Sequence, residues 1–291
     1  MVYPESTRRC TAHMVNVIKL AHVGLNAVDL SHQAEFYNDK WGLQPVDESG
    51  RDMFFRAEGP AHHVLTLHEH ESPGVHHIAL EVASPDDVDR AFDELSAAGV
   101  QVVTPPAQEL EPGVKRAIRF TDPDGFLVEL VAGVDRIADA YGQRDVKPQD
   151  LNHVVLNVAD AERSEAFYRD LLGFKLTDRF INGLSFWACN ANHHSLAFGQ
   201  ARDGQAGFHH AAFEMRDWEE WIKAVFYAGE RGIPRVWGPG RHLFGNNLFS
   251  YYKDPEGNTI EYTAEVEQLI DPDRQIRVQE PYADQWQTAQ R

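Results

Sequence analysis

Residues 238–262 read GPGRHLFGNNLFSYYKDPEGNTIEY and contain a predicted β-hairpin around the turn at 254–257. Pro presets φ and Gly tolerates positive φ, so the tetrapeptide DPEG favours a chain reversal. The segments on both sides of the turn are rich in aromatic and β-branched residues, which favours strands. In the second strand Glu261 stands between Ile260 and Tyr262, so its carboxylate is predicted to face away from both apolar neighbours. The hairpin therefore presents a carboxylate on one face of a sheet.

An earlier hairpin, with the turn DPDG at 122–125, is one of several markers of an internal repeat. The markers are separated by nearly constant offsets: 131 from His22 to His153, 131 from His63 to His194, 133 from His77 to His210, and 132 from Glu129 to Glu261. A constant offset over many markers indicates tandem duplication of a whole domain.

Each half is itself predicted to be a pair of similar units. A unit runs strand, helix, strand, strand, with room for one further strand. In the first half the predicted strands lie at 21–28, 51–57, 62–69, 77–82, 117–120 and 126–131, and the predicted helices lie at 31–41 and from Pro85 to about Gly99, with Ser84 as N-cap. Four units are too few for a solenoid, so each pair is expected to close its own core.

The predicted fold is α+β, with two tandem domains that each form an open, barrel-like sheet. The expected divisions are an N-terminal tail at 1–18, an N-terminal domain at 19–140, a linker at 141–150, a C-terminal domain at 151–265 and a C-terminal tail at 266–291. We expect the last tail to cover the C-terminal domain or a neighbouring subunit through Tyr282 and Trp286.

Composition narrows the class of protein. The 291 residues carry a formal net charge of -18, which argues against nucleic acid or an anionic membrane as partner. Two cysteines, Cys10 and Cys189, exclude a disulfide framework and fit a reducing compartment. There is neither an apolar run of membrane-spanning length nor a signal-type N-terminus, so we expect a cytoplasmic protein. Histidine is unusually frequent, with 15 residues, several of them in adjacent pairs.

Three potential metal ligands occupy equivalent points of the C-terminal units. His153 and His210 begin two of the predicted strands, and Glu261 lies in the closing hairpin. Any one of them alone is better explained by backbone contacts or solvation. By strand alternation, His153 shares one face with Val155 and Asn157. If the strands curl so that the faces carrying His153, His210 and Glu261 are concave, however, the three side chains converge as two histidines and one carboxylate. That ligand set is typical of non-haem Fe(II) oxygenases and leaves three coordination positions open.

These residues, together with the motif GPGRH at 238–242, Tyr251 and the turn at 254–257, resemble the signature of type I extradiol ring-cleaving dioxygenases. Those enzymes are catechol 2,3-dioxygenase-like members of the vicinal oxygen chelate superfamily, which has a glyoxalase-like fold of βαβββ modules. The resemblance covers residues from about 20 to 265, and the spacing from Gly-x-His to Tyr-x-x-Asp-Pro to Glu is highly specific.

The resemblance implies a role for each matching residue. It implies His153, His210 and Glu261 as ligands of Fe(II), or of Mn(II) in some members, and it implies His194 as acid/base. A histidine with a pKa near neutrality suits proton exchange with a catechol hydroxyl. His242 and Tyr251 would hydrogen-bond the substrate and the oxygen-derived intermediate. For these two, a loop cap and a cross-strand packing residue are the alternatives.

Some neighbouring residues are expected to build the pocket, and others are not. Phe186, Trp187 and Arg241 are expected to line the aromatic pocket, although core packing is equally compatible with the two aromatic residues. His193 and His209 each precede a selected histidine, so strand alternation places them on the other face and they are not expected to be ligands.

The N-terminal half retains ligand-like residues but is expected to be catalytically silent. His22, His77 and Glu129 occupy the three ligand positions and His63 the acid/base position. Arg119, however, replaces the Tyr, and no counterpart of His242 is recognisable in segment 106–116. Members of the resembled family usually have a metal-free N-terminal domain.

The resemblance therefore implies an Fe(II)-dependent enzyme that cleaves a catecholic ring next to its two hydroxyls and incorporates both atoms of O2, in aromatic catabolism. Within the same fold, the alternative is an enzyme that cleaves hydroquinones or aminophenols. A non-catalytic small-molecule-binding protein is a third alternative, although the clustered ligands count against it. A homo-oligomer is expected from the resemblance and from general prevalence.

Overall fold

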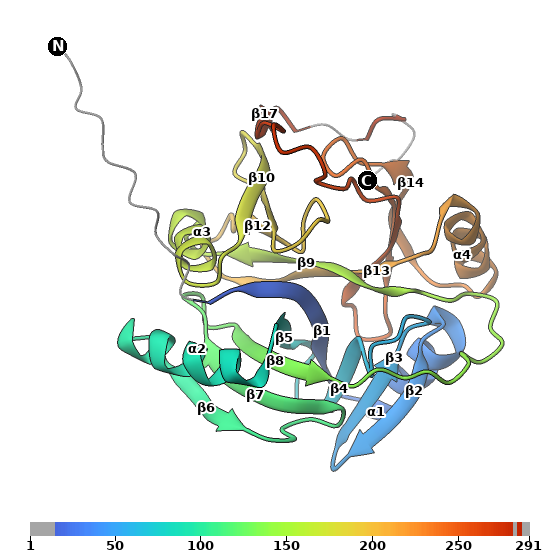
Figure 1. Ribbon diagram of the computed structural model, residues 1–291. Coiled ribbons are helices and arrows are strands. Elements are labelled where there is room, and N and C mark those ends of the chain that lie inside the picture. The colour runs from blue at the N-terminus through green and yellow to red at the C-terminus, as the bar shows by residue number, and fades with distance from the viewer. Residues whose placement is uncertain (1–14, 282–283, 287–291) are drawn as a thin grey trace.

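The structure, a computed structural model, describes residues 15–281 and 284–286. Its first sheet has eight strands in the order β2-β3-β4-β1-β5-β8-β7-β6 (Figure 1). The strands are β1 Val17–Ala27, β2 Gln44–Ser49, β3 Asp52–Arg56, β4 Leu65–Glu69, β5 Gly74–Val82, β6 Val102–Ala107, β7 Val114–Thr121 and β8 Leu127–Val134. Antiparallel pairing of β1 with β5 joins the two modules of this domain.

The second sheet has nine strands in the order β14-β15-β16-β13-β9-β12-β11-β10-β17. Its strands are β9 Asp150–Val158, β10 Lys175–Phe180, β11 Ser185–Ala188, β12 Leu196–Gln200, β13 Gly207–Glu214, β14 Arg235–Arg241, β15 Leu248–Lys253, β16 Thr259–Ala264 and β17 Arg277–Gln279. Apart from β17, this order, read from β10 to β14, matches the order of the first sheet read from β2 to β6. Strands β9 and β13 take the places of β1 and β5. The predicted α+β architecture of two tandem domains, each a pair of βαβββ modules, is confirmed, and the further strand for which the sequence left room is present in every module.

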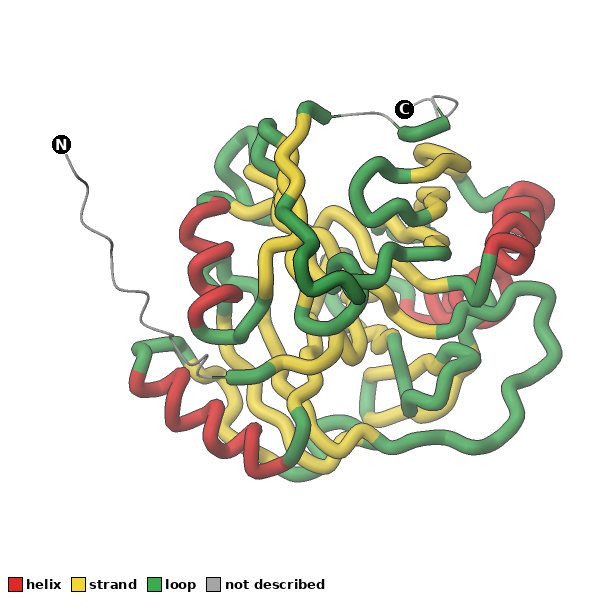
Figure 2. The backbone as a smooth tube through the Cα atoms, turned by 45° about the horizontal axis from the view of Figure 1, so that its top comes forward, coloured by secondary structure: helices red, strands yellow, loops and turns green. Residues whose placement is uncertain are grey.

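Helices flank the strands, as Figure 2 shows. They are α1 Leu30–Glu35, α2 Pro85–Ala97, α3 Ala161–Asp170 and α4 Trp218–Glu230, and a π-helix, Phe36–Trp41, continues α1. As predicted, Ser84 is the N-cap of α2, where its hydroxyl accepts a hydrogen bond from the Asp87 N–H. The helix predicted at 31–41 is therefore a short α-helix followed by a π-helix.

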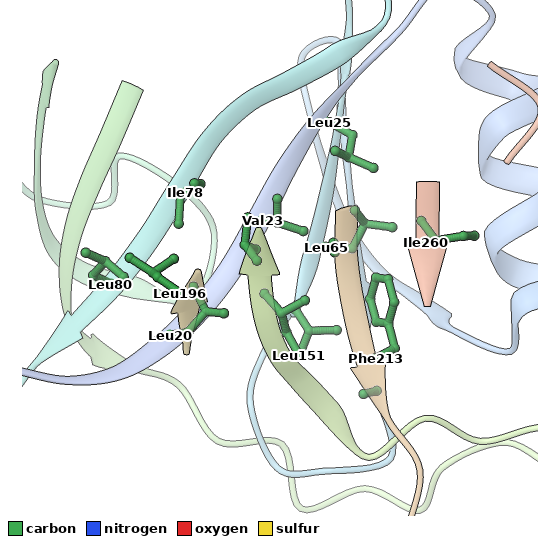
Figure 3. Close-up of a cluster of buried hydrophobic side chains, with 14 of the residues drawn as sticks. Leu20, Val23, Leu25, Leu65, Ile78, Leu80, Leu151, Leu196, Phe213 and Ile260 are labelled. Carbon is green, nitrogen blue, oxygen red and sulfur yellow. The ribbon is translucent and has the colours of Figure 1, made fainter. Parts of the chain in front are cut away.

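The principal core lies between the two sheets. Strands β1 and β9 lie side by side, and their apolar side chains interleave with those of neighbouring strands (Figures 1 and 3). The labelled side chains come from both domains: Leu20, Val23, Leu25, Leu65, Ile78 and Leu80 from the first, and Leu151, Leu196, Phe213 and Ile260 from the second. The expectation that each domain closes its own core is therefore wrong, because one face of each sheet is buried against the other domain.

The D-P-x-G turn of each domain receives the first helical segment of the other. Tyr37 donates a hydrogen bond to Asp254 Oδ2 at 3.0 Å, and Tyr168 donates one to Asp122 Oδ2 at 3.0 Å. The Trp41 ring also stacks on Tyr262, with 3.7 Å between ring centroids. The two domains are thus joined by a reciprocal pair of contacts.

The tail after 265 packs on the C-terminal domain. Strand β17 pairs in parallel with β10, and Trp286 contacts the rings of Trp218 and Trp221 in α4. Tyr282, expected to act with Trp286, lies outside the described residues. Among the helices of the described chain, none has the length and apolar character needed to cross a membrane.

Candidate active site

Three adjacent strands of the second sheet bring the predicted metal ligands together. Ala212 on β13 pairs with His153 on β9 and with Glu261 on β16. His153 Nε2 lies 3.3 Å from His210 Nε2, and Glu261 Oε2 lies 3.3 Å from His153 Nε2 and 3.1 Å from His210 Nε2. All three side chains are buried. The predicted convergence of two histidines and one carboxylate is therefore present in the structure.

Neighbouring groups orient the two imidazoles. Asn152 Oδ1 lies 2.8 Å from His153 Nδ1 and must accept its hydrogen, which leaves Nε2 with a free lone pair. His209 Nδ1 lies 2.6 Å from His210 Nδ1 and occupies the corresponding position on the second ring. The two Nε2 atoms can therefore both point to one ligand-binding position.

The charges of the cluster fit a divalent cation. Glu261 Oε2 is buried and makes no hydrogen bond to any described residue. Burial lowers the pKa of His210 to about 3, so this ring is neutral and able to bind a metal. Burial alone would raise the pKa of Glu261, but the nearby His153 and His210 hold it below its usual range. Imidazole nitrogens and a carboxylate are donors for Fe(II), Mn(II) or Zn(II).

A cavity of about 840 Å³ opens beside these ligands. His194, His242 and Tyr251 line it together with His153 and His210. Its apolar walls include a cluster of side chains on the concave face of the sheet: Val155, Phe180, Leu184, Phe186, Ala197, Leu243 and Phe244. The volume is within the range usual for a small-molecule site.

The three predicted catalytic side chains surround the ligand cluster. The His194 ring lies 4.2 Å from the His153 ring, centroid to centroid, and the Tyr251 ring lies 5.0 Å from that of His210. His242 Nε2 lies 2.9 Å from the Tyr251 hydroxyl. Burial lowers the pKa of His194 well below its usual value, and the nearby His153 adds to the effect. His194 is therefore a neutral imidazole at physiological pH.

Comparison with known proteins gives the family. The sequence profile described as the Glyoxalase/Bleomycin resistance protein/Dioxygenase superfamily matches residues 19–130 and 150–262, that is, both domains. The chain belongs to this superfamily. Its resemblance to extradiol dioxygenases extends to individual relatives and to solved structures.

Two characterised relatives from this superfamily use different metals. An iron-dependent extradiol dioxygenase from Rhodococcus jostii (strain RHA1) is 31% identical over 281 residues, which cover 88% of this chain and 92% of that protein. A manganese-dependent 2,3-dihydroxybiphenyl 1,2-dioxygenase from Geobacillus genomosp. 3 is 27% identical over 282 residues, which cover 88% of each chain. Among solved structures, a Mn(II)-bound glyoxalase from Novosphingobium aromaticivorans matches with a TM-score of 0.88 and 33% identity, covering 94% of this chain and 92% of that one.

Within this superfamily fold, not every residue predicted for the pocket reaches the cavity. Phe186 lines the cavity as predicted, but Trp187 and Arg241 do not. Trp187 alternates to the opposite face of β11, where it packs in the principal core and donates to Ser185 Oγ at 2.9 Å. Arg241 donates to the Asn246 carbonyl at 2.6 Å.

Of the two histidines excluded by strand alternation, one nevertheless lines the cavity. His209 reaches it because a register shift between Phe208 and His210 interrupts the regular alternation of β13. His193 is fully buried instead, and its Nδ1 lies 3.0 Å from His194 Nδ1.

Asn247 is a site residue that the sequence did not indicate. Its Nδ2 donates to Thr263 Oγ1 at 2.8 Å and lies 3.5 Å from Glu261 Oε1. Asn247 also lines the cavity, so it connects the carboxylate ligand to the substrate side. Asn247 is one of two adjacent asparagines in a loop, and the sequence there has no pattern that would identify it as a site residue.

The N-terminal superfamily domain repeats the cluster with one addition. His22 Nε2 and His77 Nε2 lie 2.9 Å apart, and Glu129 Oε2 lies 3.5 Å from each. Glu111, from the loop before β7, enters the cluster and forms an ion pair with Arg119. Burial lowers the pKa of His22, but Glu111 and Glu129 outweigh this effect and raise it to about 9. Segment 106–116 therefore does contribute to the first domain's cluster, through a residue that the sequence analysis did not select.

Proposed function

We propose that the chain is an extradiol dioxygenase that opens a catecholic ring beside its vicinal hydroxyls and incorporates both atoms of O2. The observation that carries this proposal is the open three-ligand cluster His153, His210 and Glu261, which faces a cavity also lined by an imidazole and a hydrogen-bonded His–Tyr pair. Its relatives, which include iron- and manganese-dependent dioxygenases, support the same reaction class.

His153, His210 and Glu261 would hold Fe(II), or alternatively Mn(II). Such an ion, when bound with three positions open, can hold a chelating substrate and dioxygen together and transfer charge between them. The protein's contribution is a dry, shaped site in which each of the three ligands is fixed by its strand.

His194 is proposed as the group that removes a proton from a substrate hydroxyl. Its ring is neutral and buried, and it lies against His153, so it is next to the position where a metal-chelating substrate would bind. His242 and Tyr251 are proposed to hydrogen-bond oxygen atoms of the reactants, because both line the cavity on the side of His210. The aromatic side chains Phe180, Phe186 and Phe244 form a wall of the cavity that these groups share.

The walls also suggest the substrate class. A cavity of about 840 Å³ with aromatic and aliphatic walls has room for more than a single ring. We therefore propose a catechol with an apolar substituent, which would contact Leu184, Phe186 and Phe244. Apolar contact of this kind contributes about 25 cal/mol for each Å² removed from water.

Anaerobic loading of the full chain with Fe(II) or Mn(II), followed by addition of O2 and a series of substituted catechols, tests the proposal. Ring cleavage should consume O2 and form a ring-opened chromophore. Hydroquinone and 2-aminophenol in parallel assays distinguish the two alternative ring-cleaving activities. Oxygen uptake also distinguishes ring cleavage from a glyoxalase activity, for which the similar structure from Novosphingobium aromaticivorans is named.

Two variants locate the reaction in the C-terminal cluster. His210→Ala should lose the metal of the C-terminal cluster and turnover, whereas His194→Phe should retain this metal and lose turnover. Metal content equal to wild type in His210→Ala would refute the ligand assignment. A metal-loaded chain that binds catechols without consuming O2 would instead indicate a small-molecule-binding protein.

A further inference from the structure

We propose that the N-terminal domain binds a second divalent metal ion in a closed, four-ligand site formed by His22, His77, Glu111 and Glu129. This ion would be structural, of the zinc class, and would take no part in ring cleavage. The inference concerns the other domain of the chain and does not depend on the proposed function.

The ligand atoms already have the spacing of a tetrahedral site. A metal–ligand distance of about 2.0–2.1 Å implies edges of roughly 3.3–3.4 Å between ligand atoms. His22 Nε2 lies 2.9 Å from His77 Nε2, 3.0 Å from Glu111 Oε2 and 3.5 Å from Glu129 Oε2. His77 Nε2 lies 3.5 Å from Glu129 Oε2 and 3.5 Å from Oε1, the other oxygen of Glu111. One ligand atom from each of the four residues lies within 4.8 Å of the other three. The same spacing, 3.1–3.3 Å, separates the three ligand atoms of the C-terminal cluster.

Three carboxylate oxygens of this cluster lack a hydrogen bond, although Glu129 Oε1 lies 3.3 Å from Arg119 Nε. Glu111 is 3% exposed and Glu129 is 0% exposed, so water does not solvate them. Glu111 Oε2 and both oxygens of Glu129 make no hydrogen bond to any residue the structure describes. Buried charges are found paired or bound to metals, because leaving them alone is costly. A cation at the centre of the four ligands would compensate these oxygens.

The repeat explains why this site is closed while the other is open. Glu111 precedes His242 by 131 residues, the same offset that separates His22 from His153. Arg119 faces Glu129 across β7 and β8 just as Tyr251 faces Glu261 across β15 and β16. The hydrogen-bonded pair His242 and Tyr251 is therefore replaced by the ion pair Glu111 and Arg119.

Because of this replacement, a ligand, Glu111, occupies the position that in the C-terminal domain belongs to the cavity-lining His242. The loop that carries Glu111 packs closely against His62, since a Cβ on Gly113 would lie 2.3 Å from His62 Cγ. Gly24, at the position of cavity-lining Val155, leaves room for the His77 ring, which a Cβ there would approach to 2.4 Å. Four protein ligands without an open position are the mark of structural rather than catalytic zinc sites.

The competing arrangement is a metal-free ion network. In that state a proton on His22 and the guanidinium of Arg119 balance the charges of Glu111 and Glu129. The two arrangements differ in one measurable quantity, the number of metal ions bound per chain.

The test uses the full chain loaded with Co(II), and in parallel with Zn(II), and counted by elemental analysis after removal of excess metal. Wild type should bind two equivalents. Glu111→Gln, which keeps the side-chain shape, should bind one. Glu261→Gln, which alters only the C-terminal cluster, should also bind one, and its Co(II) absorption should have the high intensity typical of four-coordinate Co(II). The double variant should bind none.

The outcomes distinguish the two domains. One equivalent in wild type and none in Glu261→Gln would overturn the second site. Two equivalents retained in Glu111→Gln would overturn the role of Glu111 as fourth ligand. If Glu111→Gln does not fold, the single equivalent in Glu261→Gln and its spectrum still decide. Failure of ring cleavage in wild type would leave these counts unchanged, so the proposed function is tested separately.

Discussion

Asp178 Oδ2 accepts a hydrogen bond from His193 Nε2 at 2.7 Å, and neither side chain is exposed to solvent. Burial alone would raise the pKa of Asp178, but hydrogen bonds from His193, Arg277 and Arg274 hold it below the usual range. An ionised carboxylate can only accept, so His193 carries its hydrogen on Nε2 and its Nδ1 is an acceptor. His194 Nδ1, at 3.0 Å, must then donate, which leaves His194 Nε2 unprotonated. The pair therefore sets the tautomer in which the proposed base can take a proton.

The first prediction concerns this positioning pair. Asp178→Asn should lower kcat by about ten- to hundredfold with the metal retained, as is usual for groups that orient a site from behind. It should also change the pH profile of kcat, because the tautomer of His194 is no longer imposed. A purely structural role would lower the melting temperature and leave that profile unchanged.

The repeat supplies the control for this variant. Asp47 precedes Asp178 by 131 residues, and its Oδ2 lies 3.8 Å from Nε2 of His62, the counterpart of His193. Asp47→Asn should leave kcat and its pH profile at wild-type values. Equal losses in both variants would contradict the positioning role.

The second prediction concerns Tyr251. Tyr251→Phe removes the hydroxyl that lies 2.9 Å from His242 Nε2 and leaves His153, His210 and Glu261 in place. We expect kcat to fall about tenfold or more with full metal content, because a donor to the reacting oxygens is lost. Tyr252→Phe is the matched control, since Tyr252 belongs to the principal core and accepts from Ser250 Oγ at 2.9 Å. It should affect stability and leave kcat unchanged.

The third prediction concerns the apolar wall of the cavity. Ala197 lies beside Val155 and Phe186 in the wall cluster and lines the cavity, so the larger side chain of Ala197→Leu should narrow the cavity. We expect KM for a catechol with a large apolar substituent to rise at least tenfold, while unsubstituted catechol is affected much less. Equal effects on both substrates would show that the substituent binds elsewhere. The measurement is kcat/KM for the two substrates at full metal loading.

The repeat made much of the site readable from sequence. A spacing of 131–133 residues pointed to both sets of candidate ligands, and strand alternation correctly put His153 and Val155 on one face with Asn157. Alternation failed at His209, because a register shift is a property of the strand pairing and not of the local sequence. Alternation also could not predict which of Phe186 and Trp187 faces the cavity, since two successive aromatic residues are compatible with either orientation of the strand.

Other features required three dimensions. Glu111 could have been found by applying the 131-residue offset to His242, but a Glu in a loop does not resemble a His, so residue type concealed the equivalence. The shared core between β1 and β9 had no local signal, because an apolar face reads the same whichever sheet covers it. The role of Asp178 depends on Arg274 and Arg277, which lie almost 100 residues away in the tail.

The fourth prediction concerns the reciprocal contacts between domains. Tyr37→Phe leaves Asp254 Oδ2 hydrogen-bonded to Gln33 and Asn258, at 2.8 and 2.9 Å. Tyr168→Phe removes the single described donor to Asp122 Oδ2. A hydrogen bond to a charged group contributes about 1.5–3 kcal/mol. Chemical denaturation at pH 8 should therefore show a loss near the upper end of that range for Tyr168→Phe and a smaller one for Tyr37→Phe.

The cost of Tyr168→Phe should also depend on pH. Burial raises the pKa of Asp122 to about 6, above its ordinary value near 4, although hydrogen bonds from Phe126 N–H and Tyr168 oppose the shift. At pH 8 the carboxylate is charged and the Tyr168 hydroxyl stabilises that charge. At pH 5 Asp122 is protonated in the folded state, so the same hydroxyl meets a neutral group and its removal costs less. The difference in unfolding free energy between wild type and Tyr168→Phe should thus shrink as the pH falls through 6. A constant difference from pH 5 to pH 8 would mean that Asp122 does not titrate in this range.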